Sequence, residues 1–242
     1  MHKLVVIAIL GLTASAACMG AAAAIGGKGT AGFDADGFTF FDLTPRCEVR
    51  PDLTAGDRTL DWDDSDSVSL SVSSHVRYQP GSDNRLHVSG DPQVAAHIHV
   101  QDGTIEMDCR GWRDRARELV ITLPGRTFRE FEIAGSGNLQ LDKLDQSSLK
   151  ISVAGSGSVK ANGHVDDLQV EIAGSGQADM GQVTSRSARV DIQGSGNSDI
   201  APTDAADIQI AGSGDVNLHS NPKKLETDIA GSGRIHNVSP GG

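Results

Sequence analysis

Apolar and polar positions alternate in short runs along the second half of the chain, and each run ends at a glycine. Ile or Val stands two positions before this glycine in all six runs, and five runs carry another apolar residue two positions earlier. Period-two alternation predicts a half-buried β-strand leading into each glycine turn. The turns share one triplet: Gly135-Ser136-Gly137, Gly155-Ser156-Gly157, Gly174-Ser175-Gly176, Gly194-Ser195-Gly196, Gly212-Ser213-Gly214 and Gly231-Ser232-Gly233.

The first glycines of successive triplets are 20, 19, 20, 18 and 19 residues apart, and a second apolar position follows the turn at matching offsets, as Leu139, Val159, Val216 and Ile235. A unit of about 19 residues cannot bury its apolar edge alone, but stacked units can. The sequence therefore predicts an all-β fold, a right-handed parallel β-helix over residues 129–238 with Gly-Ser-Gly corners. The right-handed sense is preferred because the repeat step varies and no strict hexapeptide rule applies.

Two substitutions follow from this interpretation. Glycine at both flanks of a corner is expected because it has no Cβ, and if Gly176 requires a positive φ, Gly176→Val should cost at least ~1 kcal/mol. Ile192 stands in the predicted interior column, so Ile192→Ala should cost about 2–5 kcal/mol if the side chain is fully buried.

The chain outside the repeat divides into four further segments. Residues 1–24 predict a signal peptide, since two polar residues precede an apolar run and small residues follow it to Ala24. Cleavage after Ala24 is preferred over lipid modification of Cys18, because Ser15 stands where lipoprotein signals normally have Leu. Residues 25–58 predict a partly ordered lead-in segment, 59–128 a less regular first half of one β domain, and 239–242 a tail.

Composition limits the partners. The formal net charge is −11, which argues against nucleic acid as the main partner, since such a surface needs a basic footprint. No later segment is apolar enough to anchor the mature chain in a membrane. Cys47 and Cys109 remain after signal cleavage, and in an oxidising compartment they can form one disulfide; two buried thiols are the alternative.

The repeated [Ile/Val]-[Ala/Gln]-Gly-Ser-Gly corners, together with upstream segments 76–81, 86–91 and 100–105, resemble the head GIN domain family of auto-transporter adhesins. The resemblance spans residues 59–238. It implies a secreted or surface-exposed β-helical domain with a role in adhesion or glycan binding. It supplies no catalytic residues.

Several residues suggest chemistry, and each also has a structural explanation. The corner serines lack the strand-to-helix turn of a nucleophile elbow, and six equivalent copies indicate a ladder of hydroxyls. Glu171 and Asp191 share one column on neighbouring coils, near the carboxyl separation of a retaining glycosidase, but any stacked column gives that distance. His97 and His99 could begin a metal site with Asp102, although the spacing lacks a convincing third ligand.

Residues that could contact a glycan are few. Arginines cluster between Cys109 and Glu118, in what could be an inserted loop, where alternating acids suggest a solvated surface. Three aromatic residues with a polar group could stack on sugars. These candidates are Arg110, Arg113, Arg115, Arg117, Trp62, Trp112 and Tyr78.

The sequence as a whole predicts a non-enzymatic, extracytoplasmic β-helix that binds an envelope glycan or a surface protein, with no cofactor and no metal. A glycan-acting enzyme that uses the carboxylates of the β-helix face is one alternative. A purely structural envelope scaffold is another. The oligomeric state is not predicted.

Overall fold

The computed structural model describes residues 45–50, 56–81, 83, 85–109 and 111–238. The predicted signal peptide, Cys18 and the start of the lead-in segment lie outside these ranges. No helix within the described ranges is long and apolar enough to cross a membrane.

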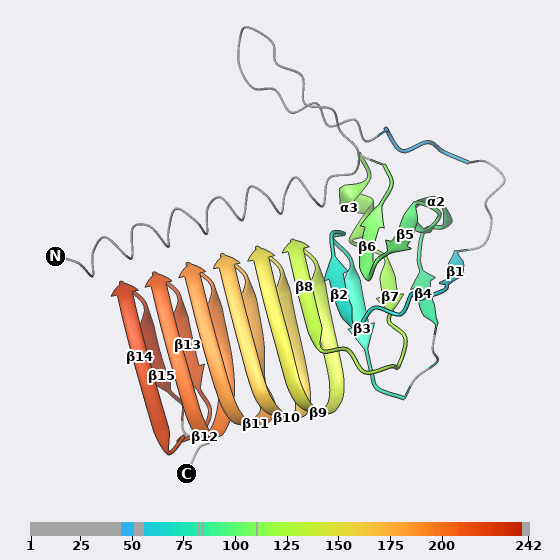
Figure 1. Ribbon diagram of the computed structural model, residues 1–242. Coiled ribbons are helices and arrows are strands. Elements are labelled where there is room, and N and C mark those ends of the chain that lie inside the picture. Colours follow the sequence, from blue (N-terminus) through green and yellow to red (C-terminus); the bar gives the residue numbers. More distant parts are fainter. Residues whose placement is uncertain (1–44, 51–55, 82, 84, 110, 239–242) are drawn as a thin grey trace, which may run out of the picture. The chain divides into compact units, whose positions relative to one another are not determined.

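Strands dominate this part of the chain, with two helices of four residues each (Figure 1). The elements are β1 (Asp57–Leu60), β2 (Ser67–Leu70), β3 (His75–Tyr78), β4 (Leu86–Ser89), α2 (Pro92–Ala95), β5 (Ile98–Gln101), β6 (Thr104–Met107), α3 (Arg113–Ala116), β7 (Val120–Thr122), β8 (Glu130–Gly135), β9 (Asn138–Gly155), β10 (Ser158–Gly174), β11 (Gln177–Gly194), β12 (Asn197–Gly212), β13 (Asp215–Leu218), β14 (Lys224–Gly231) and β15 (Arg234–Asn237).

The repeat forms a parallel β-solenoid, as predicted. Each long strand starts after one corner, bends at a bulge or register shift, and runs into the next corner, so that β9 to β12 pair in parallel with their neighbours along both parts. The strand parts before the corners form one sheet, the pre-corner sheet, and those after the corners form a second, the post-corner sheet. Figure 1 shows the coils stacked side by side from β8 to β14.

Aligned apolar columns fill the interior between the two sheets. Ile133, Val153, Ile172, Ile192 and Ile210 lie in register, and none is more than 2% exposed. Ile192 is fully buried, as its column position predicted. Because strands of one sheet lie about 4.8 Å apart, each residue of the column contacts the equivalent residue of the next coil.

The solenoid contains one more coil than the triplets mark. Strand β2 pairs in parallel with β8, and β3 pairs in parallel with β9, so residues 67–78 follow the path of a repeat unit. Its corner is Val72-Ser73-Ser74, and the Ser73 hydroxyl lies 2.9 Å from that of Ser136. The less regular first half thus begins the stack itself.

A different arrangement closes the N-terminal end of the stack, and we call its elements β1, β4, β5, α2 and α3 the cap. Beyond the added coil, β6 and β7 continue the two sheets in parallel, and β5 and β4 then pair with them antiparallel. Strand β1 adds antiparallel to β4. Helix α2 begins at Pro92, where the Asp91 carboxylate accepts a hydrogen bond from the Gln93 N–H as an N-cap. The Arg58 guanidinium donates to the carbonyls of Ala95, Ala96 and Ile98 at the end of this helix.

The two glycines of a corner meet different requirements. The first has a positive φ in every triplet, from +121° at Gly135 to +142° at Gly231. Gly176 does not, so the expectation that it needs a positive φ is wrong. It needs space instead: a Cβ there would lie 2.5 Å from Val153 Cγ1 and 2.9 Å from the Gly157 carbonyl oxygen.

Candidate functional site

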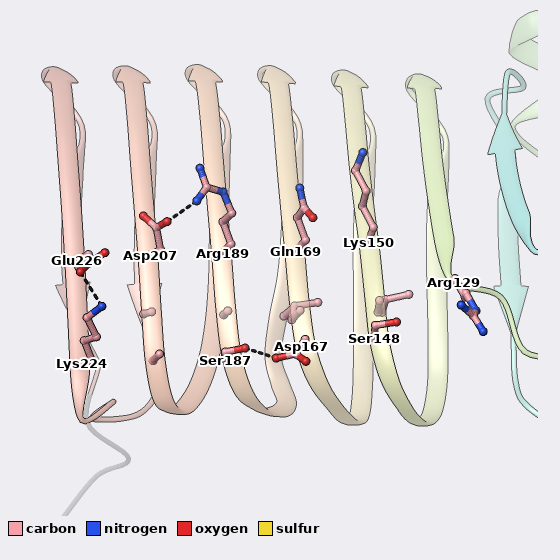
Figure 2. Close-up of a pocket in the computed structure, with 15 residues that line it drawn as sticks. Arg129, Ser148, Lys150, Asp167, Gln169, Ser187, Arg189, Asp207, Lys224 and Glu226 are labelled. Carbon is pink, nitrogen blue, oxygen red and sulfur yellow. Dashed lines mark hydrogen bonds and ion pairs between the residues drawn. The ribbon is translucent and has the colours of Figure 1, made fainter.

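The outer face of the pre-corner sheet carries a groove with a volume of about 490 Å³. We call it the ladder groove. It crosses successive coils, so its polar side chains come from equivalent positions of neighbouring strands (Figure 2). These side chains are Arg129, Ser148, Lys150, Asp167, Gln169, Ser187, Arg189, Asp207, Lys224 and Glu226.

Strand register fixes the central row of the groove. Lys150 pairs with Gln169, Gln169 with Arg189, and Arg189 with Asp207 across adjacent strands. Because side chains alternate between the two faces of a strand, the apolar interior columns force this row outward. Donor and acceptor groups therefore repeat along the stack at the strand spacing, about 4.8 Å.

The charges in the ladder groove are paired. Lys150 Nζ lies 3.3 Å from Glu130 and 3.2 Å from Glu171, and Arg189 pairs with Asp207. Burial lowers the pKa of Lys150, but hydrogen bonds to Glu171 and Glu130 outweigh it, so the pKa is raised above its usual value. The Lys150 ammonium is therefore charged at neutral pH. A ligand in the groove meets positive and negative side chains in alternation, and not a surface of a single charge.

Lys224 and Glu226, which lie 2.8 Å apart at one end of the groove, form another such pair. Hydrogen bonding to its partner raises the pKa of Lys224 and lowers that of Glu226. Both side chains are exposed, so this pair is well solvated.

The carboxylates proposed for catalysis lie beside the groove rather than in its lining. Glu171 and Asp191 are in register on β10 and β11, as predicted. Glu171 accepts hydrogen bonds from Gln169 at 2.7 Å and from the Ser152 hydroxyl at 3.4 Å, in addition to its contact with Lys150. These contacts use both oxygens of Glu171 in holding the surface together.

The corner serines are all exposed, from Ser136 to Ser232. The ladder that joins successive corners is made by the backbone: the Ser175 N–H donates to the Gly155 carbonyl at 2.9 Å, and the Ser195 N–H to the Gly174 carbonyl at 2.8 Å. The hydroxyls are left facing solvent along one edge of the stack.

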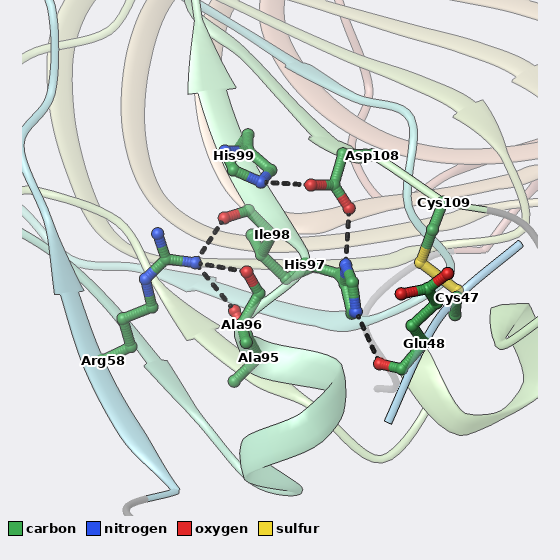
Figure 3. A network of polar contacts seen from close by, with 10 residues as sticks. All are labelled: Cys47, Glu48, Arg58, Ala95, Ala96, His97, Ile98, His99, Asp108 and Cys109. Atoms are coloured by element: carbon green, nitrogen blue, oxygen red, sulfur yellow. Dashed lines mark hydrogen bonds and ion pairs between the residues drawn. A yellow bond between two sulfur atoms is a disulfide. The ribbon is translucent and has the colours of Figure 1, made fainter. Parts of the chain in front are cut away.

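The predicted metal candidates converge, but on a different carboxylate. His97 Nδ1 lies 2.7 Å from Asp108 Oδ1, and His99 Nε2 lies 2.8 Å from Asp108 Oδ2 (Figure 3). Asp102 lies in the turn between β5 and β6 instead. Cys109 comes within 4.8 Å of His97 and Asp108, but its sulfur is bonded to another cysteine and offers no thiolate.

A disulfide joins Cys47 to Cys109, 62 residues apart in sequence (Figure 3). It fixes the 45–50 segment to the strand pair β5–β6. The Glu48 carbonyl lies 3.3 Å from His97 Nε2, so the buried imidazole bridges this segment and Asp108. The cluster is a structural connection of the cap.

Two of the aromatic residues proposed as stacking platforms for sugars pack against the hydrophobic core. Tyr78 is 1% exposed and its ring lies 5.6 Å from that of Phe128, while its hydroxyl donates to the Arg126 carbonyl. Burial raises the pKa of Tyr78 despite a backbone hydrogen bond that lowers it. Trp62 is half-buried and packs edge-on against Phe128 at 5.3 Å, so part of its ring belongs to the core.

The segment after Cys109 contains α3 rather than only a loop, but Arg115 and Arg117 are exposed, in agreement with the predicted solvated surface. Arg115 pairs with Asp91 and stacks over Trp112, 4.3 Å from the ring centroid. Arg117 lies 3.8 Å from Asp114. Arg110 is outside the described residues. The pair with Asp91 holds α3 against the start of α2.

The sequence pattern did not single out the ladder groove. Its central row stands three residues before the interior Ile/Val column in every unit, so the alignment of repeats contains the signal. That row mixes Lys, Gln, Arg and Asp, and it shows no common chemistry until the strands are stacked.

A family model described as "Putative auto-transporter adhesin, head GIN domain" matches residues 65–222. The chain belongs to the head GIN domain family. The resemblance of the corners is thereby confirmed. The adhesin description of the family fits a surface-binding role for this head GIN domain.

The head GIN domain is similar in fold to a crystal structure of a "putative adhesin" from Bacteroides fragilis, with a TM-score of 0.62 and 18% identity over 75% of this chain and 96% of that chain. A "putative lipid binding protein" from Parabacteroides distasonis is 21% identical over 76% and 96%, with a TM-score of 0.49. A "putative adhesin" from Parabacteroides merdae is 16% identical over 76% and 95%, with a TM-score of 0.44. Comparison with curated proteins gave no match.

Proposed function

We propose that this head GIN domain is a non-enzymatic binding module that works outside the cytoplasm and holds an extended, hydroxyl-rich ligand, such as an envelope glycan, along the ladder groove. The observation that carries the proposal is the row of polar side chains repeated on successive coils. A polymer that runs along the stack meets a similar set of donors and acceptors at each strand.

The pairing of charges in the groove supports a neutral or weakly charged ligand. Lys150 and Arg189 each face a carboxylate, so a polyanion would have to displace Glu171 or Asp207. Sugar hydroxyls both donate and accept hydrogen bonds, and they can insert among such groups without leaving a charge unpaired. The Gln169 amide adds a donor and an acceptor in the middle of the row.

The cellular location belongs to the same proposal. Disulfides persist in oxidising compartments, and Cys47–Cys109 therefore supports an extracytoplasmic site of action. The adhesin description of the family agrees with this location.

The test is binding of the mature chain to a glycan panel supplemented with purified envelope polysaccharide. Arg189→Ala should weaken binding at least about tenfold, equivalent to about 1.4 kcal/mol, because it removes a donor from the centre of the row. The matched control is Arg85→Ala, which removes another exposed arginine that faces an aspartate, 3.4 Å from Asp61 on the cap. Arg85→Ala should bind like the wild type.

Three results would overturn the proposal. Equal binding by Arg189→Ala and the wild type would place the ligand elsewhere. Shortening of a bound polysaccharide that stops on Glu171→Gln would establish the glycan-cleaving alternative instead. Uniformly weak, non-saturable binding across the panel would favour a scaffold.

A further inference from the structure

The C-terminal end of the solenoid exposes its interior. The last coil consists of β14 and β15, and β14 pairs with β12 while β15 pairs with β13. Within the described residues no strand pairs with their outer edges. Leu225 and Ile229, which occupy interior columns, are 48% and 41% exposed, whereas Ile192 in the column of Ile229 is fully buried.

Proteins guard exposed edges with inward-pointing charges, short strands or covering elements. The inward positions of β14 are Leu225, Thr227 and Ile229, and those of β15 are Ile235 and Asn237. Within the described residues, no further strand covers this end and no charged side chain points inward, although β15 is short. The opposite end of the stack, by contrast, is closed by antiparallel strands and two helices. The last coil therefore offers two free strand edges around an apolar centre.

We propose that two copies of the chain associate end to end through this coil, with β14 of each copy pairing antiparallel to β15 of the other. Strand β14 runs into the corner at Ser232 and β15 runs out of it. A two-fold axis through that corner, perpendicular to the stack, lays each strand beside the other with opposite direction. Both free edges of both copies are then paired at once, as a closed two-fold interface requires.

The charges of the two strands favour pairing β14 with β15. The alternative is that each strand pairs with the same strand of the other copy. The outward charged side chains of β14 are Lys224, Glu226 and Asp228, and Lys224 is paired with Glu226 in the same strand, which leaves Asp228 as the unpaired charge. The outward side chains of β15 are Arg234 and His236. Two β15 strands would set bases opposite bases, which destabilises cross-strand pairs. Unlike strands set the acids of one copy opposite the bases of the other. Asp228, Arg234 and His236 make no ion pair within the described part of the chain, so all three are available.

The apolar positions agree with the same arrangement. Interior faces map onto interior faces under the two-fold axis, so Ile229 and Thr227 of one copy lie over the Ile235 side of the other. The exposed ends of the two interiors then cover each other. Burying Leu225 and Ile229 in this way supplies the hydrophobic part of the association.

The experiment is sedimentation velocity of the mature chain from low micromolar to submillimolar concentration. The wild type should form a dimer whose dissociation constant rises with salt, because exposed charge pairs are screened. Asp228→Arg and Arg234→Asp should each weaken the dimer at least about tenfold, and the double variant should recover most of the loss. The matched control is Asp191→Arg, in the same outward column two coils away, which should dimerise like the wild type.

Each remaining outcome counts against the proposal. A wild type that stays monomeric at every concentration overturns it, and so does a double variant no tighter than the two single ones. Hydrogen exchange supplies the second readout: amides of β14 should gain protection as concentration rises. Protection that is independent of concentration would mean that another segment of the same chain covers this end. Equal melting temperatures will show that the variants remain folded.

Discussion

At the corners, two glycines that look equivalent in sequence are confined by different atoms. The first of each pair adopts a backbone conformation that L-residues avoid, and in every triplet after the first its missing Cβ also leaves room for the previous coil. At Gly174 a Cβ would lie 2.5 Å from the Gly155 carbonyl oxygen, which accepts the hydrogen bond of Ser175. At Gly135 nothing lies within 4 Å of that position, although φ is +121°.

This difference separates strain from crowding in one experiment. Gly135→Ala should cost about 1–3 kcal/mol, since it adds only an unfavourable φ. Gly174→Ala should cost clearly more, because it must also displace a carbonyl that joins two coils. Urea unfolding of both variants beside the wild type measures the two losses. Equal losses would contradict the assignment of crowding to Gly174.

The sequence predicts that these corners need glycine, but not why each one does. Periodicity identifies the turn, and the absent Cβ is a property of the residue. Whether φ or the neighbouring coil imposes the limit depends on the stacking distance, which no single repeat unit contains. The expectation of a positive φ at Gly176 failed for this reason.

Among the elements, the coils are equivalent by pattern but unequal by position in the stack. Ile192 lies between two neighbouring coils and is fully buried, while Ile229 holds the same column in the last coil and is 41% exposed. Burial of the column therefore comes from the neighbours and not from the unit itself.

Matched alanine substitutions measure that dependence. Ile192→Ala should destabilise by about 2–5 kcal/mol, since a buried cavity remains. Ile229→Ala should cost less than half as much in the monomer at low concentration, because much of its side chain already faces water. Denaturant unfolding at low protein concentration gives both values. A similar cost at the two sites would mean that Ile229 is covered.

The coil over residues 67–78 could not be identified from the repeat pattern. Its strands alternate as predicted, but its corner has Val72 and Ser74 where the other corners have glycine. Ser74 is 1% exposed and its hydroxyl has no hydrogen-bond partner. The strands of this coil pair in register with the next coil, but the open space beside Gly135 indicates that the corner between them departs from the path of the other corners. A search for the triplet cannot find a coil whose corner has a different shape.

Across the whole molecule, the regular stack was predictable and its two ends were not. A repeat reports contacts between equivalent units, so stacking, register and the interior columns follow from it. The cap of β1, β4, β5, α2 and α3 has no period. The ladder groove lies between these cases: its columns follow from the repeat, but its depth depends on how Lys150 and Arg189 lie against their partners.

The disulfide should stabilise the cap more than the solenoid. Cys47–Cys109 closes a long loop that contains β1 to β6, and such a cross-link typically contributes about 2–4 kcal/mol by restricting the unfolded chain. Reduction should therefore speed hydrogen exchange in β5 and β6 while β10 and β11 change little. The double variant Cys47→Ser with Cys109→Ser should show the same pattern without reductant. Unchanged exchange in the cap would show that its other contacts suffice.

The direction of the ladder hydrogen bonds has a mechanical consequence for a protein under load. These bonds run from coil to coil, along the stack, whereas the covalent chain winds around it. Tension between the cap and the last coil would therefore pull the coils apart in series, beginning at the weakly held end. Each coil that unfolds releases an extended length of about 60 Å. The stack would therefore lengthen in steps under a sudden pull, and each step would lower the force on the remaining coils.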